Sequence, residues 1–350
     1  MIMRLPAEWE RQSGVQLTWP HCDTEWYRLD MVLECYVDIA INIVRFEPLL
    51  IVCRDIGEAK GDISRVCSDR GWSLDMSRVT FCQAPLNDTW ARDHGGIAVY
   101  GDDGEKYLYD FVFNGWGLKF AANLDNRITR TIFSQGVFED DVIGADMRPF
   151  VLEGGSIDTD GRGTLLTTTG CLTSVNRNDH LTRDEIEAEL KKIFGLERVL
   201  WLDHGGIIGD DTDGHVDTLA RFCSPDTIAY VQCTDPDDPH YDDLAEMERE
   251  LRSFRTSDGK RYRLVPLPLP DALYLDDYRL PASYANFLIV NGGVLVPGSG
   301  SDKDEESRKR LQEVFPDREV VVIDCRALLS GHGSLHCVTM QFPDGWLRSV

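Results

Sequence analysis

The sequence has few basic residues, no closely spaced cysteine pairs and no long apolar stretch. Its 36 Lys and Arg residues stand against 60 Asp and Glu residues, which gives a formal net charge of −24. Proteins bind nucleic acid by releasing counterions with Lys and Arg, so we expect no nucleic-acid partner. No apolar run approaches the ~18 residues of a transmembrane helix, so we expect no membrane partner. An acidic surface instead favours a small cationic ligand.

The ten cysteines are scattered along the chain, and none forms a Cys-x-x-Cys pair. Most of them lie in apolar runs such as residues 49–53, where cysteine behaves as a small hydrophobic residue. Residues 1–10 lack the apolar core of a signal peptide. Scattered cysteines without such a signal are typical of a reducing compartment, so we expect a cytoplasmic protein.

Helical and strand patterns alternate over the whole length, which predicts an α/β fold. Thr182 and Glu185 form a capping-box pattern at the start of one helix. The Pro-rich residues 265–270 are interpreted as a loop, and no linker divides the chain, so we expect a single catalytic domain over residues 1–350. The predicted helices cover residues 24–46, 55–69, 126–135, 183–194, 240–254 and 303–315; the predicted strands cover residues 49–53, 79–82, 97–100, 107–112, 164–168, 227–231, 287–290, 294–297, 319–323 and 335–341.

A Gly pair follows a polar residue and precedes an apolar residue at four places. Gly pairs let the backbone turn tightly or approach a ligand closely. Coincidence is one explanation in a chain with 30 Gly residues. The other is a structural repeat whose strand ends converge on a common centre. The four copies begin at His94, Glu153, His204 and Asn291, and a looser fifth copy covers residues 331–335.

The first segment with functional character is residues 87–96, which is rich in charge and glycine and lies between two predicted strands. Loops on a rigid scaffold often carry function, and we interpret this segment as such a loop. A helix cap or a surface ion pair among Asp88, Arg92 and Asp93 explains it equally well.

The second segment contains His215 and Asp217, two residues apart at the start of an extended, half-apolar run. Residues i and i+2 of a strand point to the same face, so an imidazole and a carboxylate would project side by side. The preceding aspartates lack the EF-hand order. No other His or Cys stands at zinc-site spacing, so we expect no metal.

The third segment places Cys337 after the Gly-rich residues 331–333, at the start of the predicted strand 335–341. A nucleophilic cysteine needs close backbone approach and a His-paired or electropositive setting. The alternative is a buried structural cysteine at a strand start.

Together, one Cys, one His and several carboxylates at loop–strand junctions indicate cysteine hydrolase chemistry. A cysteine protease needs only one Asn or Asp to orient its His. Several carboxylates would suit a guanidinium group, which is planar, permanently charged and presents five N–H donors.

Long motifs along nearly the full length resemble the agmatine deiminase family, also called the Porphyromonas-type peptidylarginine deiminase family, of the guanidine-modifying (pentein) superfamily. The resemblance implies a five-bladed α/β propeller of ββαβ units, and hydrolysis of agmatine to N-carbamoylputrescine and ammonia without a cofactor, in putrescine biosynthesis. It also implies Cys337 as nucleophile, His215 as general acid/base, Asp93 and Asp217 on the guanidinium, Glu153 near His215, and Trp90 and Thr212 along the substrate channel. The motifs are Pro6-Ala-Glu-Trp-Glu10, Thr18-Trp-Pro20, Asn87-Asp-Thr-Trp-Ala-Arg-Asp93, Leu152-Glu-Gly-Gly155, Gly214-His-Val-Asp217 and Gly333-Ser-Leu-His-Cys337.

The sequence departs from the commonest family pattern at Gly331-His332-Gly333, where many members carry three Gly residues. This departure concerns the pocket near the nucleophile and therefore the far end of the substrate. A deiminase for free arginine or for arginine at peptide C-termini is the nearest alternative. An amidinotransferase and an acidic binding protein on the same fold are more distant ones. A homo-oligomer is compatible with the sequence.

Overall fold

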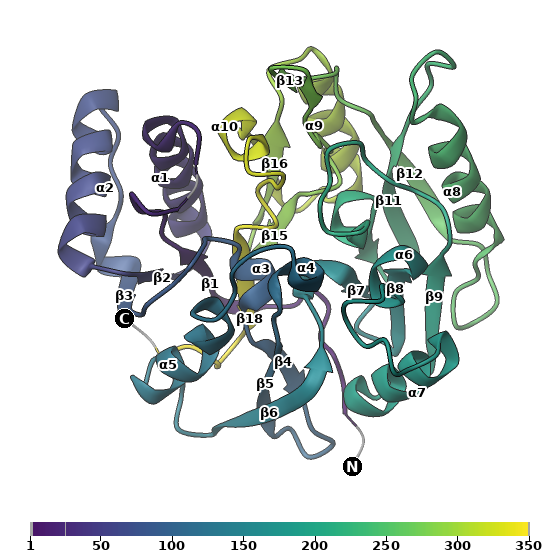
Figure 1. The fold of residues 1–350 in the computed structure, drawn as a ribbon, viewed down its shortest axis with the longest axis horizontal. Coiled ribbons are helices and arrows are strands. Elements are labelled where there is room, and N and C mark those ends of the chain that lie inside the picture. The colour runs from purple at the N-terminus through teal and green to yellow at the C-terminus, as the bar shows by residue number, and fades with distance from the viewer. Residues whose placement is uncertain (1–2, 25, 349–350) are drawn as a thin grey trace.

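The computed structural model describes residues 3–24 and 26–348 and has a mixed α/β architecture (Figure 1). Within these residues, five sheets share one pattern. A first strand pairs antiparallel with a second, and a helical connection leads to a third strand that pairs parallel with the second. The predicted α/β class is confirmed, and no closed sheet joins the described strands.

Four of the five units follow one another along the chain. The first has β4 (Ile97–Tyr100), β5 (Lys106–Val112), α4 (Gly115–Leu118), α5 (Ile128–Ser134) and β6 (Val142–Val151). The second has β7 (Ile157–Thr159), β8 (Thr164–Thr168), α6 (Thr169–Leu172), α7 (Arg183–Phe194) and β9 (Arg198–Leu202). The third has β10 (Ala220–Ser224), β11 (Thr227–Gln232), α8 (Tyr241–Ser253) and β12 (Arg263–Pro268). The fourth has β15 (Leu288–Val290), β16 (Gly293–Gly298), α9 (Lys303–Val314) and β17 (Glu319–Asp324).

The fifth unit joins the two ends of the chain. The C-terminal β18 (Thr339–Pro343) pairs antiparallel with the N-terminal β1 (Gln12–Thr18), and α1 (Leu29–Phe46) leads to β2 (Leu49–Cys53). A second crossover through α2 (Ile56–Arg70) adds β3 (Val79–Gln83) to the same sheet. The small β13 (Tyr274–Leu275) and β14 (Tyr278–Arg279) form a separate hairpin, and α10 (Arg326–Leu329) precedes the segment that leads into β18.

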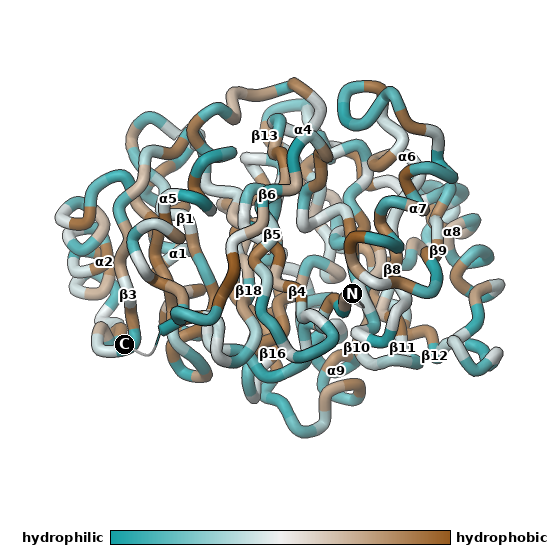
Figure 2. The backbone as a smooth tube through the Cα atoms, turned by 90° about the horizontal axis from the view of Figure 1, so that it is seen from below, coloured by the Kyte–Doolittle hydropathy of each residue, from teal (hydrophilic) through white to brown (hydrophobic). Residues whose placement is uncertain are grey.

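The longer helices lie around the rim of the molecule, with the strands toward its middle (Figure 1). Hydrophobic stretches follow many of the strands, whereas the outer connections are mostly hydrophilic (Figure 2). A helix at the rim packs one face against the strands and leaves the other toward water, so an amphipathic sequence is expected. α7, for example, buries Ile186, Leu190 and Phe194 on one face. The predicted capping box at its start is confirmed, since Thr182 and Glu185 exchange side-chain-to-backbone hydrogen bonds.

Three local predictions are wrong. Residues 335–338 form a turn, and the strand predicted at 335–341 is β18, which begins at Thr339. The helix predicted from residue 24 begins at Leu29. The Pro-rich residues 265–270, interpreted as a loop, largely belong to β12, an edge strand on which proline is tolerated because its outer side needs no N–H donor.

Within residues 3–24 and 26–348, no helix combines the length and apolar character needed to cross a membrane.

Candidate active site

A cavity of about 370 Å³ lies where loops of several units meet. Its described lining is strongly acidic and contains no Lys or Arg. The walls between the acids are aromatic, and aromatic faces attract cations. This combination suits a cation on an apolar stem. The acids are Asp23, Asp88, Asp93, Asp210, Asp211 and Asp217; the aromatic residues are Trp26, Trp90, Trp116 and Phe120.

The polar side chains in and directly behind the inner wall of this cavity come from equivalent places in the units. Each lies two to five residues before the first strand of its unit, within or next to a short turn or helix. Such turns end at the strand entrances, so the side chains of different units converge. Asp93 precedes β4 in α3 (Ala91–His94), Glu153 precedes β7, His215 and Asp217 precede β10, Asn286 precedes β15, and Cys337 precedes β18.

Two local geometries differ from the sequence prediction. Asp217 lies in a 3₁₀ turn (Val216–Thr218) with His215 at its start, so the two side chains do not alternate along a strand. Positive φ at Asp213 (68°) and Gly214 (87°) turns the chain just before them. The interpretation of residues 87–96 as a loop was also wrong in part, because Asp93 lies in the short helix α3.

The Cys337 thiol is buried beside polar groups of two other units. Its Sγ lies 3.2 Å from Asn286 Nδ2 and 3.9 Å from Asp217 Oδ2. Burial, together with the charges of Asp217 and Asp93, raises the pKa of this thiol well above its ordinary value. The thiol is therefore protonated until a cation enters the site and offsets those carboxylates.

Asp93 is held from two sides. Its Oδ2 accepts a hydrogen bond from Trp116 Nε1 at 2.9 Å, and its Oδ1 accepts one from the Gly155 amide at 3.0 Å. Burial raises the pKa of Asp93 to about 6, even though His215 lowers it. Trp116 reaches this position from α4, a left-handed turn in which all four residues have positive φ.

The His215 imidazole is buried, and neither of its ring nitrogens has a hydrogen-bond partner. Its Nδ1 lies 3.6 Å from Asp93 Oδ1. Burial lowers the pKa of His215, but Asp93, Cys171 and Glu153 outweigh burial and raise it well above the ordinary value. The surroundings of His215 thus favour its protonated form, with the Asp93 carboxylate and the Cys171 thiol beside the ring.

Glu153 does not line the cavity and instead lies behind His215. Both of its oxygens accept from Arg177 Nε at 3.0 Å, and both side chains are fully buried. Glu153, Cys171 and His215 form the one described group whose ligand atoms lie close enough, within 4.8 Å of one another, to hold a metal ion. The Arg177 cation on Glu153 opposes a metal cation there, so we assign Glu153 no ligand role.

Trp90 and Thr212, both placed by resemblance along the substrate channel, do line the cavity. Trp90 Nε1 donates to Asp88 Oδ2 at 3.0 Å, and its ring lies 5.3 Å from that of Trp26. The Thr212 hydroxyl accepts from the His215 amide at 3.0 Å and donates to Asp210 Oδ1 at 2.6 Å. Thr212 therefore contributes to the loop that presents His215 as well as to the wall.

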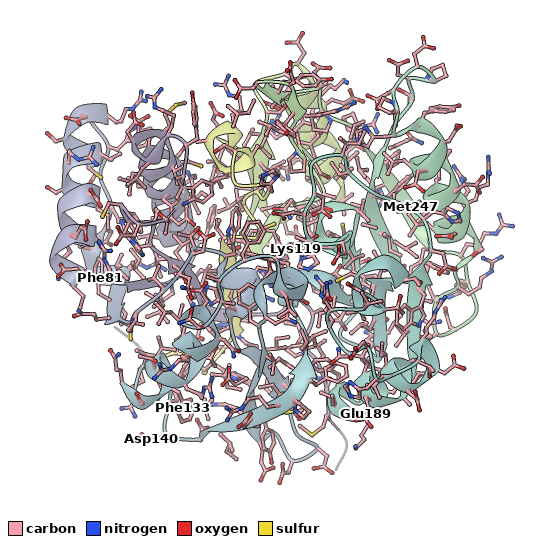
Figure 3. All side chains as sticks on the ribbon, viewed as in Figure 1. Phe81, Lys119, Phe133, Asp140, Glu189 and Met247 are labelled. Atoms are coloured by element: carbon pink, nitrogen blue, oxygen red, sulfur yellow. The ribbon has the colours of Figure 1, made fainter. Side chains whose placement is uncertain are left out.

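His332 also lines the cavity. It has a positive φ of 68°, and its Nδ1 lies 2.8 Å from the Gly209 carbonyl. Lys119, near the centre of Figure 3, holds the loop of residues 209–213, since its ammonium contacts the Asp211 carbonyl and Asp213 Oδ1. Together, these contacts hold residues 209–213 in place beside the Gly-rich residues 331–333.

Sequence reasoning missed several polar residues around the site. Asn286 is the most direct of them, because it contacts the Cys337 thiol. Glu8 and His336 lie within motifs quoted for the family resemblance, but no role was assigned to them, and the signal that could have found Asn286 is its position just before a unit's first strand. The others are Trp26, Trp116, Arg177, Arg221, Glu8 and His336.

A mixed α/β chain that places a buried thiol, an imidazole and paired aspartates around one acidic cavity has the features of a guanidine-modifying enzyme. The chain belongs to the Porphyromonas-type peptidyl-arginine deiminase family, whose sequence model matches residues 4–343. The family resemblance inferred from the motifs is confirmed.

Individual proteins that are similar in sequence and structure agree with membership of this family. An agmatine deiminase of Pseudomonas syringae pv. tomato is 35% identical, with 97% of this chain and 95% of that protein covered. The structure of a C. jejuni agmatine deiminase with substrate bound is 36% identical, with a TM-score of 0.88 and coverage of 99% and 98%. A Porphyromonas gingivalis structure, provisionally called an arginine deiminase, is 51% identical, with a TM-score of 0.93 and coverage of 99% and 100%.

Proposed function

We propose that the protein is an agmatine deiminase, which hydrolyses agmatine to N-carbamoylputrescine and ammonia without a cofactor. The observation that carries the proposal is one acidic cavity that ends at a buried thiol and has no Lys or Arg among its described lining residues. Agmatine carries a guanidinium at one end and an ammonium at the other, so both of its ends are cations. The agmatine deiminases among its relatives support the same reaction.

In this reaction Asp93 and Asp217 would bind the guanidinium through charge-assisted hydrogen bonds, each worth ~1.5–3 kcal/mol. The bound cation offsets the two carboxylates that raise the pKa of the Cys337 thiol, so the thiol releases its proton to solvent as substrate enters and regains one from the hydroxyl of the second adduct when the C–S bond breaks. The thiolate then attacks the central carbon, and the C–S bond forms while the C=N bond becomes single.

His215, protonated in the free site, would give its proton to the departing amino group. Ammonia leaves, and Cys337 remains bonded to the carbon as an S-alkylthiouronium. The neutral His215 then takes a proton from water, whose oxygen attacks the same carbon. Collapse of this second adduct breaks the C–S bond and returns the thiol. The ureido product is neutral and loses its ion pairs with Asp93 and Asp217, which favours its release.

The far end of the cavity distinguishes agmatine from arginine. Four further acids, Asp23, Asp88, Asp210 and Asp211, line the cavity and would receive that end of the substrate; burial raises the pKa of Asp211 to about 6 although the charge of His332 lowers it. An ammonium is favoured beside these acids, whereas the carboxylate of arginine would be repelled. The Porphyromonas gingivalis relative makes a deiminase for free or C-terminal arginine the second candidate. Amidino transfer would need a second substrate site.

The five strand units and the single domain also have a place in the proposed function. Five units with one strand pattern, each with a polar residue before its first strand, support a five-bladed propeller around the cavity. The chain 1–350 would act as one catalytic domain in the cytoplasm, in putrescine supply, alone or as a homo-oligomer.

A colorimetric ureido assay tests the function across agmatine, free arginine and a peptide with C-terminal arginine. We expect turnover of agmatine only. Asp211→Asn should raise KM for agmatine more than it lowers kcat, because Asp211 would touch the ammonium and not the reacting carbon. Faster turnover of arginine than of agmatine by the unmodified enzyme would replace the first candidate with the second.

A further inference from the structure

His336, the residue before Cys337, is held between two carboxylates at the back of the site. Its Nδ1 lies 2.7 Å from Asp217 Oδ2, and its Nε2 lies 2.8 Å from Glu8 Oε2. All three side chains are buried, with 2% exposure for His336, none for Asp217 and 5% for Glu8. Glu8 reaches this place from the N-terminal segment, 328 residues away in sequence.

These two contacts determine the charge of the ring. An ionised carboxylate only accepts hydrogen bonds, and a neutral imidazole has a single N–H to donate. Both contacts therefore require a proton on each nitrogen, which makes His336 an imidazolium, unless one of the acids is protonated. Glu8 is ionised, because its Oε2 also accepts from Arg221 Nη2 at 2.7 Å and its Oε1 accepts from the Ile289 amide at 2.7 Å.

The second carboxylate, Asp217, is ionised for a related reason. Burial raises its pKa, but the hydrogen bond and charge of His336, together with the charges of His215 and Arg221, outweigh burial and hold the pKa below its ordinary value. Its Oδ2 is occupied by His336, whereas its Oδ1 is buried with no partner. One oxygen of Asp217 is thus fixed from behind and the other is left for a ligand. The charged or titratable groups that face Asp217 and Glu8 are His336, His215, Cys337, Asp93, Arg221, Arg92, Asp158, Glu47 and Arg318.

We propose that His336, as an imidazolium held by Glu8, is a positioning residue that keeps Asp217 ionised and presents its free oxygen to the guanidinium. This inference rests on the proposed deiminase function, since it assigns a partner to one of the two guanidinium-binding carboxylates. His336 also fixes the nucleophile, because its own amide donates to Asn286 Oδ1 at 2.9 Å and Cys337 follows it directly.

Two amide variants separate charge from geometry. In His336→Asn the amide nitrogen takes the place of Nδ1 and keeps a neutral donor for Asp217. In His336→Gln it takes the place of Nε2 and leaves Asp217 without a donor. We expect kcat/KM for agmatine to fall about 10- to 100-fold in the Gln variant and less in the Asn variant. The acid limb of the pH profile, which Asp93 otherwise sets near pH 6, should move to higher pH in both variants, because burial then raises the pKa of Asp217 without the imidazolium to oppose it and adds a second protonation.

Matched controls are His180→Gln and Glu10→Gln, which make the same chemical changes at a surface histidine and at a partly exposed acid two residues from Glu8. Both should retain the activity and pH profile of the unmodified enzyme. A folded His336→Gln with an unmoved acid limb would overturn the proposal, whether or not its activity falls. If the His336 variants do not fold, the Glu8→Gln profile decides: a shifted limb supports the proposal and an unshifted limb overturns it.

The protonation of the His336 ring nitrogens can be measured directly, which tests this proposal independently of the proposed function. ¹⁵N NMR of the unmodified protein at about pH 8, where an ordinary imidazole is neutral, should show both His336 ring nitrogens protonated. One unprotonated nitrogen would overturn the proposal even if agmatine is turned over. Failure of the unmodified enzyme to act on agmatine, with both nitrogens protonated, would instead refute the proposed substrate.

Discussion

Gly155→Ala should remove activity from a protein that remains folded. Gly155 is not among the glycines with positive φ, so its backbone can accept alanine. A Cβ at this position would, however, point into the catalytic group. It would lie 2.6 Å from His215 Nδ1, 2.8 Å from Asp93 Oδ1 and 3.1 Å from Asp217 Oδ2. The methyl group would therefore meet three of the proposed catalytic side chains at once.

The size of the effect follows from these distances. Ordinary contacts of a Cβ begin near 3.4 Å, so the three atoms must move by roughly 0.3–0.8 Å. Misplacement of reacting groups by ~1 Å can lower the rate ~100-fold. We expect kcat/KM for agmatine to fall ~100-fold or more, with most of the change in kcat, because the methyl group disturbs the reacting atoms rather than the far end of the cavity.

Alanine substitutions at two other glycines, Gly61 and Gly154, provide the comparison for Gly155→Ala. Gly61→Ala in α2 has no atom within 4 Å of the added Cβ and should keep full activity. Gly154→Ala should lower the melting temperature, because its Cβ would lie 2.3 Å from the Arg92 carbonyl, which is backbone. Steady-state kinetics and thermal unfolding of all three variants provide the test. A Gly155→Ala enzyme as active as Gly61→Ala would refute the arrangement of His215, Asp93 and Asp217 described above.

Further predictions concern the nucleophile, pH and stability. Cys337→Ala should abolish ureido formation, and a chelator should leave the unmodified enzyme unchanged; loss of activity with EDTA would contradict metal-free chemistry. The kcat/KM for agmatine should rise with pH through about 6, where Asp93 loses its proton. Trp116→Phe should move that limb to higher pH and lower kcat/KM ~10-fold, because Asp93 loses its 2.9 Å donor. Glu47→Gln should raise the free energy of unfolding by ~1–3 kcal/mol at about pH 8 and much less near pH 4. Burial raises the folded-state pKa of Glu47 from 4.5 to about 7, so its ionisation destabilises the folded protein increasingly as pH rises between those values. Equal effects of this substitution at both pH values, measured by urea unfolding, would contradict that prediction.

Much of the fold could be predicted because the long helices are amphipathic and their ends are marked. The predicted helix at residues 183–194 agrees residue for residue with α7, whose capping box and C-terminal Gly195 are visible in the sequence. Strands without an apolar run were missed. β6 exposes most of its central residues and contains Pro149, and β1 carries Gln12, Ser13 and Gln16, so neither has a strand pattern that composition alone could reveal.

Four chemistry-bearing residues of the proposed site, Cys337, His215, Asp93 and Asp217, could be proposed from Gly-rich and charged segments at loop–strand junctions, whereas Glu153 came only from the family resemblance. Their supports could not be proposed, because a buried ion pair depends on contacts far apart in the chain. Glu8 and Arg221 are 213 residues apart and form such a pair at 2.7 Å. No local pattern distinguishes them from surface charges, and only the folded arrangement shows that each neutralises the other in the interior.

The Gly-pair pattern, for which coincidence and a structural repeat were both open, follows the units only in part: besides two of the four clear copies, the looser copy at residues 331–335 also leads toward a first strand, β18. Only two of the four Gly-pair copies, those at His94 and Glu153, lead into the first strand of a unit. The His204 copy lies in a loop, and the Asn291 copy forms the β15–β16 hairpin. What does recur is a polar side chain placed just before each first strand. The apolar cores lie between the units and are shared by them, and of the chemistry-bearing side chains at the strand entrances they include only Cys337, so the chemistry of an entrance is free to differ from one unit to the next. One entrance can then supply a thiol, another an imidazole and others carboxylates, provided that each buried polar group finds a partner from a neighbouring unit, as Asn286 does for Cys337.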